Sequence, residues 1–174
     1  MVKNEDIIYV KKCLDGDISA FESLYDNYQK KIFNIVYRIT NNYNDTCDIT
    51  QNIFIKVYKN LEAYNPKYKF FSWIYRITIN ETLNYLSNSS KKTSLEHQIV
   101  SEQKNPEANC ISNDLNNKIQ SALNKLTPDY RIVMILRHLH ELTYEEISHI
   151  LEIPEKRVKS RLFSARQELK KTML

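Results

Sequence analysis

The chain has 174 residues, of which 42% are hydrophobic and 26% are charged. This length suits one ordinary domain or two small ones, and the composition excludes a chain that is disordered throughout. One Gly and four Pro are too few for a sandwich or barrel of many hairpins. The fold class is therefore predicted to be all-α, with helices joined by short polar loops.

Positive charge is concentrated near the C-terminus. The net charge is +4, and residues 154–171 hold seven basic but only two acidic side chains, a footprint expected for nucleic-acid binding. Cys13, Cys47 and Cys110 lack metal-ligand spacing, so no metal site, disulfide framework or cofactor is predicted. The polar N-terminus and the lack of a roughly 18-residue apolar run predict a cytoplasmic protein without membrane insertion of its own.

The N-terminal part begins with two predicted helices. Residues 4–14 form a short helix that Gly16 is placed to end. A longer helix follows, where Ser19 and Glu22 have capping-box spacing. It continues to the break at 41–45. Its expected buried stripe consists of apolar residues at three- and four-residue steps: Phe21, Leu24, Tyr25, Tyr28, Ile32, Ile35, Val36 and Ile39.

Two further helices complete this part. The first runs from about 45 to 62, and its apolar side is formed by Ile49, Ile53, Phe54, Val57, Tyr58 and Leu61. The second contains FFSWIYRITIN (70–80) and is predicted to continue to Leu86. Its core spacing is carried by Phe70, Trp73, Ile74 and Ile77, and a second apolar face by Phe71, Tyr75 and Ile79. A small isolated bundle does not need that second face, so we expect its rings to serve a partner.

A polar, weakly periodic segment at 89–105 predicts a flexible linker between two domains, 1–88 and 106–174. In the second domain Pro106 can begin a helix that reaches about Leu126. Thr127-Pro128 predicts an N-cap followed by Pro at the first helical position. Thr143 and Glu146 form a second capping box, and Pro154 can begin the last helix.

Residues 142–171 predict a helix-turn-helix, with a short helix over about 144–151 and a longer basic one after a tight turn. The inner side of the second helix carries Val158, Leu162, Ala165 and Leu169. Its outer side carries Lys156, Ser160, Phe163 and Gln167, flanked by Lys159 and Ser164. Such groups can contact base edges in a major groove, while cations neutralise phosphates. A solvated basic helix in an ordinary bundle is the alternative.

The segment LTPDYRIVMILRHLHELTYEEISHILEIPEKRVKSRLFSARQEL (126–169) resembles the −35-binding domain of bacterial sigma factors. It is most similar to the extracytoplasmic-function (ECF) group of the sigma-70 family. The family often has Gly where Glu141 and Glu152 stand, and commonly Arg where Ser164 stands. The resemblance implies that the −35 element is contacted by Lys156, Arg157, Lys159, Ser160, Arg161, Phe163, Ser164 and Arg166.

Residues 21–86 resemble the second conserved region of the same factors. DITQNIFIKVYKNL (48–61) is similar to the segment that grips the clamp helices of the largest RNA polymerase subunit. The resemblance implies a docking role, without chemistry, for Asp48, Gln51, Asn52 and Phe54. Asn52 stands where the family commonly has an acidic residue.

FFSWIYRITIN is similar to the family segment that melts promoters and reads the −10 element. Aromatic faces stack on bases, cations follow a single-stranded backbone, and the Asn80 amide offers both a donor and an acceptor to a flipped base. The resemblance implies that the melted strand is contacted by Tyr64, Lys67, Lys69, Phe71, Trp73, Tyr75, Arg76 and Asn80.

The sequence thus predicts a transcription initiation factor, not an enzyme. Its implied partners are core RNA polymerase (the clamp helices and the flap), promoter DNA, and an anti-sigma factor that can be membrane-anchored, as in a stress response. A helix-turn-helix regulator with a helical sensor domain is the runner-up, and it leaves 48–61 and 70–80 as coincidence. An enzyme has little support, because no nucleophile motif or phosphate loop occurs and no HExxH-type arrangement is formed by His97, His138, His140 and His149.

Overall fold

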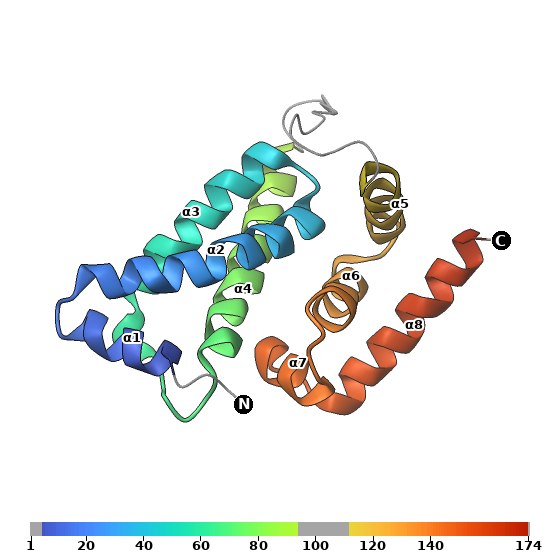
Figure 1. Cartoon of the computed structure of the whole chain (residues 1–174). Coiled ribbons are helices and arrows are strands. Elements are labelled where there is room, and N and C mark those ends of the chain that lie inside the picture. Colours follow the sequence, from blue (N-terminus) through green and yellow to red (C-terminus); the bar gives the residue numbers. More distant parts are fainter. Residues whose placement is uncertain (1–4, 94–111, 174) are drawn as a thin grey trace.

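The computed structural model describes residues 5–93 and 112–173, and within them it is all-α without strands, as the composition predicts (Figure 1). The N-terminal half consists of α1 (Glu5–Leu14), α2 (Ile18–Thr40), α3 (Tyr43–Lys59), the single 3₁₀ turn η1 (Leu61–Ala63) and α4 (Phe70–Thr93). The C-terminal half consists of α5 (Ser112–Asn124), α6 (Pro128–Met134), the π-helical segment η2 (Ile135–Leu139), α7 (Tyr144–Leu151) and α8 (Glu155–Met173).

Helix ends follow local capping chemistry. Gly16 has φ +96° after α1, and its N–H donates to the Cys13 carbonyl at 3.0 Å, as expected for a terminating Gly. The N-cap of α2 is Asp17, whose Oδ1 accepts from the Ser19 N–H at 3.0 Å and hydroxyl at 2.6 Å. The predicted Ser19–Glu22 capping box is therefore wrong. A carboxylate one residue before the helix is a stronger acceptor at its positive end.

The core of the N-terminal half is formed by α2, α3 and α4 around Ile32, Ile35, Val36 and Ile53, which are fully buried. Most of the predicted stripe on α2 is confirmed. Tyr25 is an exception on α2, with an exposed fraction of 40%, and Phe21 is only partly buried. On α3, Tyr58 of the predicted apolar side is 51% exposed. A tyrosine has an apolar ring and a polar tip, so helical spacing alone does not decide between core and surface.

Helix α4 is longer than predicted. It passes Leu86 and runs to Thr93, because no Gly or Pro interrupts it there. Buried Thr78 and Thr82 donate their hydroxyls to the Ile74 and Thr78 carbonyls at 2.8 and 2.7 Å, so neither polar group is orphaned. The predicted linker is helical over residues 89–93. Its remainder, and the predicted helix start at Pro106, lie outside the described residues.

The C-terminal half contains the predicted helix-turn-helix. The Thr143 Oγ accepts from the Glu146 N–H at 3.1 Å, and Glu146 Oε2 accepts from the Thr143 N–H at 2.9 Å, which confirms the capping box. The inner face of α8 is confirmed too, since Val158, Leu162 and Ala165 are fully buried. None of the described helices is long and apolar enough to cross a membrane.

The two halves are in contact along two seams (Figure 1). In the first, α7 packs on α4. In the second, the end of α2 meets α5 and α6: Arg131 Nη1 donates to the Ile39 carbonyl at 2.6 Å, and Arg38 Nη2 donates to Asn116 Oδ1 at 3.0 Å. Burial lowers the pKa of both guanidinium groups.

Candidate nucleic-acid interface

The outer face of α8 is a basic, exposed surface. Phe163 is 64% exposed, although a Phe ring in water is unfavourable, and it lies on the same face as exposed Lys156 and Ser160. Arg157 and Lys159 are also exposed. The Lys159 ammonium lies 3.4 Å from the Glu155 carboxylate of α8 and 5.4 Å from the centroid of the Tyr144 ring of α7, so it contacts both helices. This face offers donors, an apolar ring and cations to a duplex groove.

The other predicted −35 residues are held closer to the protein. The Arg161 guanidinium pairs with Asp129 at the start of α6, and its side chain is only 19% exposed. Arg166 is exposed, with Nη2 3.4 Å from His138 Nε2, and Ser164 is partly buried. Burial, followed by the charges of Arg166 and Arg137, lowers the pKa of His138. Arg161 therefore anchors α8 to α6 in addition to any contact it makes with DNA.

Two turns of the C-terminal half adopt the left-handed backbone that favours Gly. Glu141 has φ 55° and Glu152 has φ 53°, the positions where the family resemblance points to Gly. The Glu152 N–H donates to the Ser148 carbonyl, and the Ser148 hydroxyl donates to the Ile153 carbonyl at 2.6 Å, which closes the turn between α7 and α8. The turn between α7 and α8 is thus formed with Glu152 in a strained left-handed backbone conformation.

A groove of about 600 Å³ runs over α2 and α3 beside the predicted docking residues. Asp48, Gln51 and Asn52 are exposed on α3, whereas Phe54 is buried and forms the floor against the Tyr25 ring at 4.6 Å. The groove is lined by Phe21, Tyr25, Phe33, Cys47, Thr50, Gln51, Phe54, Ile55, Tyr58 and Lys59. The sequence prediction missed its apolar wall, because Tyr25 and Tyr58 were assigned to the core. The sequence signal for this wall was a tyrosine, whose ring is apolar and whose hydroxyl is polar, at the edge of the apolar stripe of each helix.

An aromatic cluster fixes the start of α4. The ring centroids of Tyr64, Phe70 and Trp73 lie 5.3 to 5.6 Å apart, and the Tyr64 hydroxyl donates to the Tyr68 carbonyl at 2.6 Å. Tyr64 and Phe70 are buried, and Trp73 is partly buried. The cluster therefore holds the 64–69 loop against the helix, and Tyr64 lies inside the fold, not on its surface.

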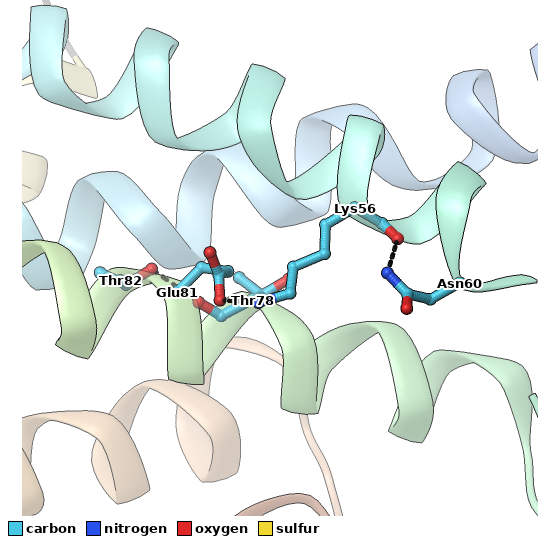
Figure 2. A network of polar contacts seen from close by, with 5 residues as sticks. All are labelled: Lys56, Asn60, Thr78, Glu81 and Thr82. Carbon is cyan, nitrogen blue, oxygen red and sulfur yellow. Dashed lines mark hydrogen bonds and ion pairs between the residues drawn. The ribbon is translucent and has the colours of Figure 1, made fainter. Parts of the chain in front are cut away.

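Three of the predicted −10 residues are exposed: Lys67, Lys69 and Asn80. Beside Asn80, Glu81 Oε1 pairs with Lys56 Nζ of α3 at 2.5 Å, and Asn60 Nδ2 donates to the Lys56 carbonyl at 2.7 Å (Figure 2). This network joins the end of α3 to the middle of α4. It fixes the helix on which Asn80 stands.

The other −10 residues contact the C-terminal half. Tyr75 is 4% exposed, and its hydroxyl lies 3.4 Å from His140 Nδ1. Burial raises the pKa of Tyr75 to about 12 and lowers that of His140 to about 4. The rings of the second apolar face of α4 were expected to serve a partner, but in this structure that face is covered: Ile79 is 2% exposed and Phe71 is partly buried. Helix α7 of the C-terminal half packs on α4.

Ion pairs border this buried face. Lys69 Nζ lies 2.7 Å from Glu146 Oε1, and Arg76 Nη1 lies 2.9 Å from Glu152 Oε1. Arg76 Nη2 also donates to the His149 carbonyl at 2.8 Å. Lys69 lies 5.5 Å from the centroid of the Phe71 ring. These contacts were not predicted from the sequence. Their signal was Glu152 itself, a charged residue at a position suited to Gly.

Comparison with known proteins identifies two family regions in the chain. Residues 24–92 match the family described as Sigma-70 region 2, and residues 116–169 match the family described as Sigma-70, region 4. The chain is 33% identical over 176 residues to the ECF RNA polymerase sigma factor SigW of Bacillus subtilis, covering 94% of each chain. It is 32% identical to the ECF sigma-E factor of Escherichia coli K12, covering 94% of this chain and 92% of that one.

Solved structures share the fold at low sequence identity. CnrH, determined in complex with the cytosolic domain of CnrY, aligns with a TM-score of 0.73 at 19% identity and covers 97% of both chains. The sigma factor RpoE of Bartonella quintana, determined with the anti-sigma factor NepR, aligns with a TM-score of 0.74 at 17% identity. It covers 90% of this chain and 98% of that one. With its two regions in family order, the chain belongs to the extracytoplasmic-function group of the sigma-70 family of RNA polymerase sigma factors.

Proposed function

We propose that this sigma factor docks on core RNA polymerase and directs initiation at promoters whose −35 element it reads as duplex and whose −10 element it reads as melted strand. The single observation that carries the proposal is the presence of two distinct candidate DNA surfaces in one chain. They are the exposed basic face of α8 and the region 67–80, which includes the loop before α4 and the first turns of α4. The domain division 1–88, 89–105 and 106–174 belongs to the same proposal.

Duplex recognition is assigned to α8. Phe163 offers an apolar contact to a thymine methyl, Ser160 a hydroxyl to a base edge, and Lys156 and Lys159 charge to phosphates. Arg157 and Arg166 add charge at the flanks, and Arg161 contributes from the edge where Asp129 holds it. Each lost base contact is expected to cost about 1–3 kcal/mol of discrimination.

Melting requires no catalytic residue. Binding energy for the opened strand shifts the equilibrium between duplex and bubble toward the bubble. Asn80 is placed to read the edge of an unpaired base, Lys67 and Arg76 to follow the backbone, and Phe71 and Tyr75 to stack once they are uncovered. Trp73 and Tyr64 support this surface from the aromatic cluster.

Docking on polymerase is assigned to the groove on α2 and α3. Asp48, Gln51 and Asn52 provide a polar rim, and Phe54 with Tyr58 provides an apolar floor and wall suited to a helical partner. Two structural neighbours were solved with partner proteins, one with the cytosolic domain of CnrY and the other with the anti-sigma factor NepR. We infer that an anti-sigma factor likewise controls this chain by covering its polymerase-binding faces, and that the chain acts in the cytoplasm.

The docking claim is tested by co-purification with core polymerase in the absence of DNA. Gln51→Ala should weaken recovery because Gln51 lines the groove and is exposed, so its loss leaves the fold intact. Asn34→Ala, at an exposed position on α2 outside the main groove, is the control and should behave as wild type. Failure of the wild-type chain to bind core polymerase would return the helix-turn-helix regulator as the better explanation.

A further inference from the structure

The cations of the −10 surface are occupied by carboxylates of the same chain. Here the −10 surface means Lys69, Tyr75 and Arg76. Lys69 pairs with Glu146 at 2.7 Å and Arg76 with Glu152 at 2.9 Å. A carboxylate resembles a phosphate group in its negative charge and paired oxygen acceptors. Helix α7 thus presents anions where a DNA backbone would lie.

The contact between α7 and α4, here called the seam, also covers Tyr75, the aromatic member of the −10 surface. The Tyr75 and His140 rings meet edge to face with centroids 5.5 Å apart, and Tyr75 is 4% exposed. A base cannot stack on a ring that is covered in this way. While α7 rests on α4, the Tyr75 ring is therefore covered and the two cations are paired with carboxylates.

Glu152 supplies an independent indication that the seam is specific. Its φ of 53° strains an L-residue, and Gly would remove the strain. Glu141 has the same backbone strain at φ 55°, but its exposed side chain lies away from the recorded ion pairs between the halves. At position 152 the strained residue gives a contact with Arg76 that Gly cannot make.

The ion pairs of the seam are weak enough to be broken by a competing ligand. The four paired side chains are 19–66% exposed, and ion pairs between exposed groups are individually weak. Arg76 Nε is buried without a hydrogen-bond partner, so α7 does not satisfy the whole guanidinium group. A ligand with more acceptor oxygens can therefore compete for Arg76.

We propose that α7 is an intramolecular competitor of the melted promoter strand: Glu146 and Glu152 hold Lys69 and Arg76, and the halves must separate before the strand binds. The proposal rests on the proposed function of the −10 surface. It differs from control by a second protein, because the inhibiting carboxylates belong to this chain. The apparent dissociation constant for the strand then rises by the inverse of the open fraction.

The test compares two charge-matched variants of the full chain. Glu146→Gln with Glu152→Gly removes both seam carboxylates; the Gln keeps a side-chain acceptor for the capping box, and the Gly relieves strain at φ 53°. The control, Glu145→Gln with Glu141→Gly, makes the same charge change, with Glu145 on the first turn of α7 and strain relieved at φ 55° of Glu141. Thermal unfolding verifies that both variants fold.

Two readouts are measured for each protein. Fluorescence energy transfer between dyes on exposed Cys47 and on Gln167→Cys, with Cys13 and Cys110 replaced by Ser, reports the separation of the halves. Fluorescence anisotropy with a short, randomised single-stranded DNA reports strand binding. The seam variant should show a larger separation than the control and bind the strand about threefold to tenfold more tightly than the control does.

Each remaining outcome contradicts the proposal in a distinguishable way. Unchanged separation in the seam variant would show that the carboxylates do not hold the halves together. Increased separation with binding equal to the control would show that α7 does not compete with the strand, while the −10 surface itself stands. Increased separation with no strand binding by any protein would overturn the proposed function of the −10 surface together with the competition.

Discussion

Neighbouring apolar residues on α4 differ in what they contribute. Ile74 is 1% exposed between the helices of the N-terminal half, whereas Ile77, one turn further on, is only partly buried. Replacing Ile74 by Ala should lower the free energy of unfolding by about 2–5 kcal/mol, because it leaves a cavity in a packed core. Ile77→Ala should cost less. Chemical denaturation measures both, and equal losses would contradict the assigned packing.

Asn80 is exposed on the same helix and carries a different role. Asn80→Ala should leave the free energy of unfolding unchanged but weaken binding of single-stranded −10 DNA by about 1–3 kcal/mol, the cost of one lost base-edge contact. Asn84→Ala, at an exposed position one turn along, is the matched control. Fluorescence anisotropy with the labelled strand measures the effect. Equal behaviour of the two variants would contradict a contact between Asn80 and the −10 strand.

His140 makes stability depend on pH. Its pKa is lowered from 6.5 to about 4, first by burial and then by the charge of Lys31. Because the folded-state pKa lies below the unfolded value, its contribution is fully present above about pH 6.5 and is lost as the pH falls toward about 4. After allowance for partial exposure, the loss should be about 1–2 kcal/mol.

The measurement is the free energy of unfolding against pH for wild type and His140→Gln. The variant keeps a polar group near the Tyr75 hydroxyl but cannot titrate, so its curve should be flatter between about pH 6.5 and about 4. Parallel curves would show that His140 does not titrate as its burial at the seam requires.

At the scale of the element, the N-caps of α6 and α7 differ in their side-chain hydrogen bonds. The Thr143 side chain accepts the Glu146 N–H, and Thr143→Ala should destabilise the C-terminal half by about 0.5–2 kcal/mol. Thr127 is the N-cap of α6 but makes no side-chain capping bond, so Thr127→Ala should cost less. Thermal unfolding of both variants gives the comparison. A larger loss for Thr127→Ala would contradict the assigned caps.

Local signals predicted most elements. Periodicity located α2, α3 and α8, and the capping box located α7, because these signals lie within a few residues of the feature they specify. Two predictions failed where local signals compete. The N-cap of α2 is Asp17, not Ser19. Tyr25 lines the groove and not the core, because a tyrosine is suited both to a buried and to a partly exposed position. The candidate residues on α8 were predictable from one face of one helix.

At the scale of the whole molecule, the contact between halves was not predictable from periodicity. Tyr75 is buried and Lys69 is paired because residues about seventy positions later in the chain cover them. No local pattern encodes such a meeting. The second apolar face of α4 was visible in the sequence, but the sequence assigned it to single-stranded nucleic acid. In this structure the face is covered, and α7 of the C-terminal half packs on α4.

The central claim, that one chain reads two promoter elements in two forms, is tested most directly by run-off transcription with purified core polymerase. The template is a promoter identified by transcript start mapping after overexpression, with its −10 and −35 elements altered one at a time. The wild-type factor should give a specific transcript that is lost when either element changes. Phe163→Ala should impair a duplex promoter, and Asn80→Ala should impair the −10 step even on a template with an intact −35 element. A transcript that needs neither element, or no specific transcript at any mapped promoter, would contradict the account.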